Sequence, residues 1–451
     1  MLCGYATSFQ AYSASRYTMR RLFLNAGPIA HLSPSGFSGA LTGDVMSDEN
    51  ALIHPSGRAI LTSDSKIESI ADSEELQAEY SPDVTIGNAK PTLLKNGKFE
   101  VWDLAGQAVI PGLVDGHNHL IWTGDRSNEV ALREQGYSYR EISDMGGGIN
   151  KTVRETREAS HNLLLQEGLE RVNTAQQFGS TFLETKSGYG LTVQDELKIL
   201  DVSNQLGEEK SIHTTATWLG AHSVPKGMTR SQYVEQLLSE QLPAVVEQGI
   251  ATYADVFCED GWFTLEETED ICKAAKSEGL EIRLHVDEFA DCGGAQLAAE
   301  LGALTADHAG WSSDSAREAC HKSGVIQGFL PSTPHVLGLD HWPPFQKCID
   351  NDWAWSLATD FNPNCPSLSL PFSAQLAMRH SSVSSLSALV ASSRNSAASL
   401  VEGQGTGLGM IIEGGPSSLN ILSSKKVTDW CNSPDLPFAA TLSNGEWVNS
   451  L

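Results

Sequence analysis

Two histidines separated by a single residue follow an apolar segment in the first third of the chain. The segment VIPGLVDGHNHLIW covers residues 109–122 and places His117 and His119 near its end. Because side chains alternate between the two faces of a strand, these two imidazoles point the same way. Two imidazoles on one side form half of a metal site, but a His-x-His pair is also common without a metal. The pair therefore suggests a metal site as a hypothesis, and other residues of the chain must support or exclude it.

Short apolar runs alternate with helical stretches through the middle of the chain. We predict strands at residues 108–120, 180–190, 212–222, 253–259, 281–289, 304–308, 325–332 and 354–361. Eight β units separated by helices predict an α/β fold, a (β/α)8 TIM barrel. The alternative is a doubly wound open sheet, which would carry a glycine-rich phosphate turn after its first strand. The sequence contains neither G-x-G-x-x-G nor a Walker A motif.

Polar residues close most of the predicted strands, and in such barrels the chemistry lies where the strands end. These residues are His117, His119, Lys186, Tyr189, His222, His285, Glu288, His308, Asp360, Asn362 and Asn364. Three imidazoles and one carboxylate suit zinc or iron(II) and leave one coordination position for water. A divalent cation lowers the pKa of such a water from about 16 to about 7, which supplies hydroxide at neutral pH. The paired histidines are therefore predicted to form one arm of a catalytic metal cradle.

Composition limits the partners of the protein. The 451 residues include 30 basic and 56 acidic side chains, so the net charge is −26. This balance argues against nucleic acid, whose phosphates require a basic surface. We expect no membrane span, because no stretch of about 18 uninterrupted apolar residues occurs. The eight cysteines are scattered without a Cys-x-x-Cys motif, which indicates reduced thiols in a cytoplasmic protein.

The two ends of the chain share a β character. Residues 19–110 contain short strand-like runs punctuated by Gly, Ser and Asp, and residues 405–451 return to that pattern. We expect both to pair into one small β-sandwich domain, with a catalytic barrel at 111–404. Residues 1–18 are expected to be an N-terminal extension. Met19 is an alternative start, and an organelle transit segment is a second alternative.

Several motifs are more specific than the histidine pair. They are PGLVDGHNHLIWTGDR, GGGINKTVRETREAS, ETKSGYGL, WLGAHSVP, HVDEF and ATDFNPN, within residues 100–405. With these motifs the chain resembles the metal-dependent amidohydrolase superfamily and, within it, the imidazolonepropionase family. The resemblance implies a barrel with a small β-sandwich built from both termini. It also implies a homodimer that opens the ring of 4-imidazolone-5-propanoate to give N-formimidoyl-L-glutamate in histidine degradation.

The resemblance further implies a role for each matching residue. The metal ligands, for one zinc or iron ion, would be His117, His119, His285 and Asp360. The substrate contacts would be Arg126, Tyr139, Tyr189, His222, Glu288, Asn362, Asn364 and Cys365. Arg126 would pair with the propionate, since a planar guanidinium suits a carboxylate.

The resemblance leaves the division of proton transfer open among three catalytic residues. Asp360 would accept the proton of the attacking water, and Glu288 would serve the leaving ring nitrogen. His308 would act at the oxygen where negative charge develops.

Some positions depart from the family. Asn364 and Cys365 stand where the family often has Gly and Thr, which puts the shape of the carboxylate pocket in doubt. A related amidohydrolase that acts on another cyclic amide, or that deaminates a heterocycle, is therefore the alternative. A barrel without activity that binds a protein is least favoured, because every expected ligand and proton carrier is present. Lys186 is the only lysine available for a carbamate-bridged pair of metals, and its ETKSGYGL context argues against that role.

Overall fold

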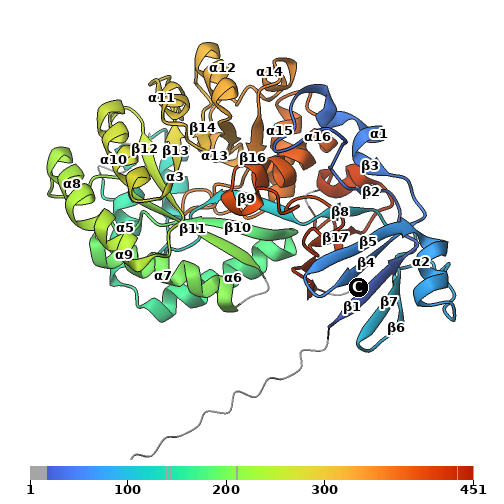
Figure 1. Ribbon diagram of the computed structural model, residues 1–451. Helices are drawn as coiled ribbons and strands as arrows, with labels where there is room; N and C mark the ends of the chain where they lie inside the picture. The colour runs from blue at the N-terminus through green and yellow to red at the C-terminus, as the bar shows by residue number, and fades with distance from the viewer. Residues whose placement is uncertain (1–17, 138–140, 143–144, 210–211, 434, 450–451) are drawn as a thin grey trace, which may run out of the picture.

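The barrel predicted from the sequence is confirmed. The computed structural model describes residues 18–449 except 138–140, 143–144, 210–211 and 434 (Figure 1). Its largest sheet has eight strands in chain order: β9 (Leu113–Asn118), β10 (Ser180–Lys186), β11 (His213–Ala221), β12 (Tyr253–Cys258), β13 (Glu281–Val286), β14 (Thr305–His308), β15 (Ile326–Phe329) and β16 (Trp355–Leu357). Every neighbouring pair is parallel. The sheet closes where Asn118 bridges to Phe361, beside a 2.8 Å hydrogen bond from the His119 amide to the Phe361 carbonyl.

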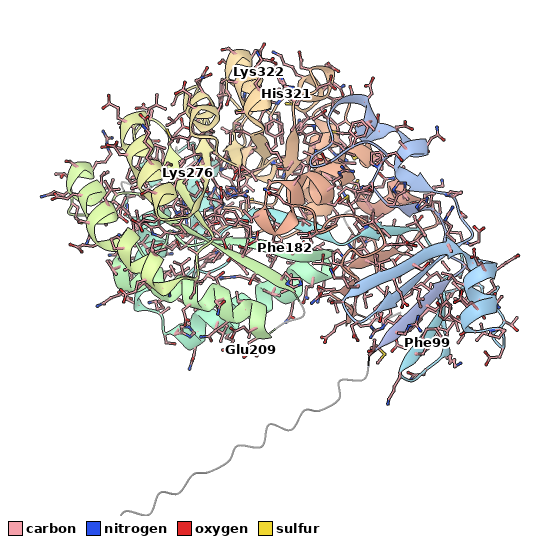
Figure 2. The ribbon with its side chains drawn as sticks, viewed as in Figure 1. Phe99, Phe182, Glu209, Lys276, His321 and Lys322 are labelled. Carbon is pink, nitrogen blue, oxygen red and sulfur yellow. The ribbon has the colours of Figure 1, made fainter. Side chains whose placement is uncertain are left out.

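Helices cover the outside of the barrel (Figure 1). They are α5 (Gly148–Glu158), α6 (His161–Gln177), α7 (Val193–Glu209), α8 (Arg230–Gln236), α9 (Leu242–Gln248), α10 (Leu265–Ser277), α11 (Gly294–Leu301), α12 (Asp314–Ser323), α14 (Phe345–Asp350), α15 (Leu370–Arg379) and α16 (Ser385–Val390). Every residue of β10 and β12 is buried, as expected for parallel strands covered on both faces. Glu209, Lys276 and Lys322 are exposed near the carboxyl ends of α7, α10 and α12 (Figure 2).

The strand predicted at 108–120 is two strands in the structure. β8 (Val109–Pro111) pairs with β17 (Leu419–Leu422) in a smaller sheet, and β9 then begins at Leu113 in the barrel. Gly112 separates them, and a Cβ at this position would clash with the side chain of Thr181. A glycine thus leaves room for the Thr181 side chain against the backbone at the change of sheet. The histidine pair therefore stands at the end of β9, and β8, which precedes β9, is held in the smaller sheet.

Two smaller sheets lie beside the barrel (Figure 1). One has the order β5 (Lys66–Asp72), β4 (Arg58–Ser63), β1 (Arg20–Leu24), β7 (Phe99–Asp103) and β6 (Thr92–Lys95). The other has the order β19 (Glu446–Asn449), β18 (Phe438–Ser443), β17, β8, β2 (Ile29–Ala30) and β3 (Ile53–His54). A shared apolar core joins the two sheets through side chains that include Phe23, Ile60, Val109, Ile421 and Leu442.

Both ends of the chain therefore contribute strands to one sheet. The domain boundaries at 19–110, 111–404 and 405–451 stay predictions, and residues 1–17 lie outside the described residues. Within the described part of the chain, no helix has the length and apolar character needed to cross a bilayer.

Candidate active site

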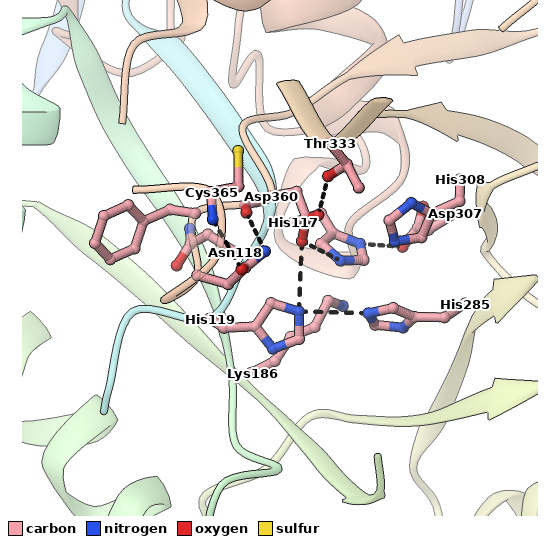
Figure 3. A network of polar contacts seen from close by, with 12 residues as sticks. His117, Asn118, His119, Lys186, His285, Asp307, His308, Thr333, Asp360 and Cys365 are labelled. Atoms are coloured by element: carbon pink, nitrogen blue, oxygen red, sulfur yellow. Dashed lines mark hydrogen bonds and ion pairs between the residues drawn. The ribbon is translucent and has the colours of Figure 1, made fainter. Parts of the chain in front are cut away.

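Four predicted metal ligands converge at the carboxyl end of the barrel. His117 lies on β9 and His119 directly follows that strand, His285 lies on β13, and Asp360 lies in the segment that follows β16. The Nε2 atoms of His117 and His119 each lie 3.6 Å from Asp360 Oδ1. His119 Nε2 lies 3.4 Å from His285 Nε2 (Figure 3). Four donors at metal distances of about 2.0–2.2 Å are spaced by roughly these separations, so the set fits one small cation.

The protonation state of the imidazoles also fits a metal. Burial lowers the pKa of His117 and of His119 well below the usual value of histidine, so both rings are neutral, as metal ligands must be. His117 Nε2 is buried and has no hydrogen-bond partner among the described residues. A buried nitrogen of this kind calls for a partner. The donor set of three imidazoles and one carboxylate suits zinc or iron(II).

Two carboxylates orient the imidazoles from behind. His117 Nδ1 lies 2.8 Å from Asp307 Oδ2, and His285 Nδ1 lies 3.0 Å from Asp255 Oδ1. Since a carboxylate accepts a proton on Nδ1, each contact leaves Nε2 unprotonated toward the cradle. The sequence reasoning missed both aspartates. Their signal was weak, because each lies within a buried strand rather than at its end.

Lys186 is held within the barrel and does not point to a second metal. Its Nζ lies 2.9 Å from Glu184 Oε1 and 2.8 Å from Asp255 Oδ2, and all three residues are buried. Burial opposes the charge of the ammonium, but Asp255 and Glu184 outweigh it and raise the pKa of Lys186 above its usual value. A carbamate forms from a neutral amine, so this paired ammonium is in the wrong state for it.

Asp360 occupies a constrained position. Its φ is +51°, in the left-handed region, and its Oδ2 accepts a short hydrogen bond from the hydroxyl of Thr333, on α13 (Ser332–Leu337). Burial raises the pKa of Asp360 to about 6. Thr333 was also missed, since nothing in the sequence links α13 to Asp360.

A cavity opens directly above the cradle. The predicted residues that line it are Arg126, Tyr189, His222, Glu288, His308, Asn362 and Asn364, together with His119, His285 and Asp360. Phe257, Trp262 and Phe289 add an aromatic wall. Tyr139 lies outside the described residues. Cys365 is fully buried and is not among the described residues that line the cavity, so the structure does not bring it to the site.

One side of the cavity is aromatic and neutral. The rings of His119 and His222 stack at 5.0 Å, and Tyr189 packs against His222 at 5.2 Å. Burial lowers the pKa of His222 to about 3, so this imidazole is neutral. Its Nδ1 donates to the carbonyl of Gly188 at 3.0 Å, which leaves Nε2 as an acceptor.

A buried carboxylate holds the loop that carries Tyr189. Glu196, at the start of α7, accepts hydrogen bonds from the amides of Gly188, Gly190 and Leu191 at 2.7–3.0 Å. These amides flank Tyr189 in the chain, so Glu196 fixes the loop from below. The SGYGL motif was recognised in the sequence, but its support on the following helix was not.

Glu288 stands on the opposite side of the cavity in a setting that favours its protonated form. Burial raises the pKa of Glu288 well above the usual value of glutamate, and the charges of Asp360 and Glu259 act in the same direction. Glu259 also accepts a 2.8 Å hydrogen bond from the Glu288 amide, which fixes the start of the loop. His308 Nε2 lies 3.7 Å from Glu288 Oε2, and burial lowers the pKa of His308 well below its usual value. The surroundings therefore favour the protonated form of Glu288 and the neutral form of His308.

Arg126 reaches the cavity wall as half of an ion pair. Its Nε and Nη2 donate to the two carboxylate oxygens of Glu129 at 3.0 and 2.8 Å, and both side chains are buried. Glu129 lies on α3 (Asn128–Glu134) and also accepts from the Gly148 amide at 2.8 Å. The guanidinium is thereby fixed in place. The sequence reasoning did not find Glu129, which lies three residues from Arg126.

The fold and the site define a class of protein. A (β/α)8 barrel with a histidine and aspartate cradle at its strand ends and a small β domain has the architecture of the amidohydrolase superfamily. A. niger ochratoxinase has a similar fold, with a TM-score of 0.64 over 95% of this chain and 95% of that chain, at 14% identity.

Relatives with similar sequences identify the family within this class. No family model matches the chain. The imidazolonepropionase of Symbiobacterium thermophilum is 37% identical over 385 residues, which cover 84% of this chain and 85% of the relative. The imidazolonepropionase of Alkaliphilus metalliredigens is 42% identical over 283 residues, 62% of this chain and 67% of the relative. The chain belongs to the imidazolonepropionase family.

Proposed function

We propose that this protein hydrolyses the ring of 4-imidazolone-5-propanoate to N-formimidoyl-L-glutamate, a step of histidine degradation. One observation carries the proposal: in a chain of this family, the cradle opens into the same cavity as Glu288, His308 and Arg126. The cavity thus holds a ligand set for a cation, a protonated acid and a guanidinium.

We propose that His117, His119, His285 and Asp360 hold one zinc or iron ion. Such a cation supplies a Lewis acid and makes a water molecule ionisable near neutral pH. The paired state of Lys186 supports a single ion, because a bridging carbamate has no neutral amine to form from.

The proton transfers are assigned to three residues. Water adds to the ring carbonyl carbon, and the bond from that carbon to the adjacent ring nitrogen breaks. Asp360, whose carboxylate reaches the cradle, accepts the proton that the attacking water loses. Glu288 gives its proton to the departing nitrogen, and the new carboxylate keeps the oxygen of the water. His308, a neutral imidazole, donates to the carbonyl oxygen as charge develops there.

The remaining residues bind the substrate. His222 Nε2 accepts from the ring N–H, and Tyr189 packs against the ring. Arg126 binds the propionate. From the family resemblance alone, we propose that Asn362 and Asn364 contact the glutamate part of the product and that Tyr139 assists Arg126 at the propionate. Cys365 does not line the cavity and is left out of these contacts.

The same resemblance leads us to propose a homodimer in the cytoplasm. Its partner is a small molecule rather than a nucleic acid, which the net charge of −26 supports.

The test combines metal analysis with an assay of ring absorbance on freshly prepared substrate. We expect about one equivalent of zinc or iron and loss of the imidazolone absorbance. Metal without ring opening, together with turnover of a hydantoin or a purine, would favour the related amidohydrolase instead. A protein with neither metal nor turnover would support a barrel that only binds.

A further inference from the structure

Two arginines near the outer wall of the cavity differ in their charge surroundings. Arg126 forms a bidentate ion pair with Glu129, and both side chains are buried. Arg133, one helical turn further along α3, is partly buried. Its Nη1 donates to Asn364 Oδ1 at 2.6 Å. Within the described ranges, no carboxylate forms an ion pair with Arg133.

This difference matters for an anionic substrate. The pair of Arg126 and Glu129 has no net charge, so Arg126 offers hydrogen bonds but little net attraction. A third charge brought against that pair would leave one negative charge in excess in a poorly solvated place. Arg133 is the cation of this region whose charge is not offset by a described carboxylate.

We propose that Arg133, held by Asn364, supplies the counter-charge for the carboxylate of the substrate and makes the enzyme selective for anionic rings. This inference rests on the proposed function and adds a residue to it. Arg133 acts from behind the cavity wall, where Asn364 stands between it and the cavity. It is therefore a specificity-determining residue and not a catalytic one.

The loop that carries Asn364 is built rigidly, so the arginine is held at a defined place. Asn362 Oδ1 accepts from the amides of Asn364 and Cys365 at 2.8 and 3.1 Å, and its Nδ2 donates to the Asp360 carbonyl at 2.7 Å. Asn364 thereby ties α3 to the loop of a proposed metal ligand. A glycine, which the family often has at this position, has no side chain to make this contact.

The overall charge of the protein gives Arg133 a second effect. A net charge of −26 repels anions at a distance. A cation behind the cavity wall that pairs with no carboxylate of the described residues offsets this repulsion locally and raises the rate of encounter with anions. The contribution should weaken as salt screens the charge.

The direct test is Arg133→Gln in the full chain loaded with metal. We expect KM for 4-imidazolone-5-propanoate to rise about tenfold with kcat within about twofold, since one partly screened charge is lost. For a neutral imidazolone that carries a methyl group in place of the propionate, kcat/KM should not change. Arg154→Gln is the matched control, because Arg154 is 56% exposed and its nearest carboxylate, Glu155, lies 3.9 Å away. Thermal unfolding checks that each variant is folded.

A double-mutant cycle with Asn364→Gly tests how the charge is held. If Asn364 positions Arg133, the single change Asn364→Gly raises KM. The loss of binding free energy in the double variant is then smaller than the sum of the losses in the two single variants. Strict additivity would show that Asn364 does not hold Arg133.

The inference fails separately from the proposed function. If the wild-type protein opens the ring but Arg133→Gln keeps the ratio of kcat/KM between anionic and neutral rings, Arg133 has no part in selectivity. If the wild-type protein opens no ring, the proposed function is wrong. Calorimetric binding of 4-imidazolone-5-propanoate then tests the charge, and equal affinity of wild type and Arg133→Gln would overturn the inference.

Discussion

The metal cradle and the carboxylate-binding end of the cavity are built in different ways. The cradle (His117, His119, His285 and Asp360) stands at the ends of barrel strands, where hydrogen-bonded register sets each position. The carboxylate-binding end (Arg126, Glu129, Arg133 and Asn364) stands on α3 and on loops, where side-chain pairs set each position. The cradle residues are thus placed by the barrel backbone and then oriented by buried side chains, whereas the residues of the carboxylate-binding end are held mainly by one another.

Removing the paired histidines should give the largest effect. We expect His117→Ala with His119→Ala to lose the metal and to lower kcat/KM by more than about a thousandfold, because no ion remains to activate water. Metal analysis and the ring assay measure both quantities. His161→Ala is the control, since its imidazole is partly exposed and pairs with Asp201 at 2.7 Å, away from the cavity. Full activity of the double variant would refute the cradle.

Glu288→Gln should cause the second largest loss of activity. Loss of a general acid lowers kcat by about 10² to 10⁴. Burial raises the pKa of Glu288, and only its protonated form gives a proton, so wild-type kcat should fall as pH rises through that pKa. The Gln variant should lack this alkaline limb. Glu281→Gln, an exposed residue at the other end of β13, is the control. If kcat of Glu288→Gln still falls at alkaline pH as in the wild type, that fall belongs to the titration of another group.

The two regions also differ in how far the sequence predicts them. Strand alternation and the barrel place a set of histidines and Asp360 at one end of the barrel. The resemblance to the family then selects His117, His119, His285 and Asp360 as the ligands among them. All eight strands lie where apolar runs predicted them, although the first run divides between two sheets at Gly112. The same periodicity places Arg126 on a loop but does not say what that loop contacts. Nor does it bring Arg133 to Asn364, which is 231 residues further along the chain.

The residues that hold the functional groups in place could not be predicted from the sequence for a related reason. Asp255, Asp307, Glu196 and Glu259 each hold a functional group through a contact that depends on the packing of neighbouring strands and loops. A buried carboxylate in a strand looks the same in a sequence whether it orients a ligand or pairs with a lysine. Asp255 does both.

Asp255→Asn tests the support of the cradle. The amide cannot accept the His285 Nδ1 proton with the strength of a carboxylate, so we expect metal affinity to fall about 10- to 100-fold. Competition with a chelator measures the change. Asp201→Asn removes the partner of the surface residue His161 and serves as the control. Unchanged affinity would show that β13 alone orients His285.

At the carboxylate-binding end, Arg126→Ala should raise KM for the propionate substrate by about tenfold or more, with a small change in kcat. It removes a charged donor from the wall and leaves Glu129 buried without its partner. Steady-state kinetics on the propionate and on the neutral methyl analogue separate the effects. An unchanged KM would remove Arg126 from the substrate contacts.

Glu129→Gln should change turnover least, and its sign distinguishes two roles of the ion pair. If Glu129 mainly neutralises Arg126, the variant frees a full positive charge, and KM for the propionate should fall or stay within a fewfold range. If Glu129 mainly orients the guanidinium, KM should rise as in Arg126→Ala. We expect the first result, because the Gln oxygen still accepts from Arg126 Nε or the Gly148 amide. The free energy of unfolding should nevertheless decrease by about 3 kcal/mol, since a buried arginine loses its counter-charge. Urea unfolding measures this loss, and an unchanged midpoint would show that solvent already screens the pair.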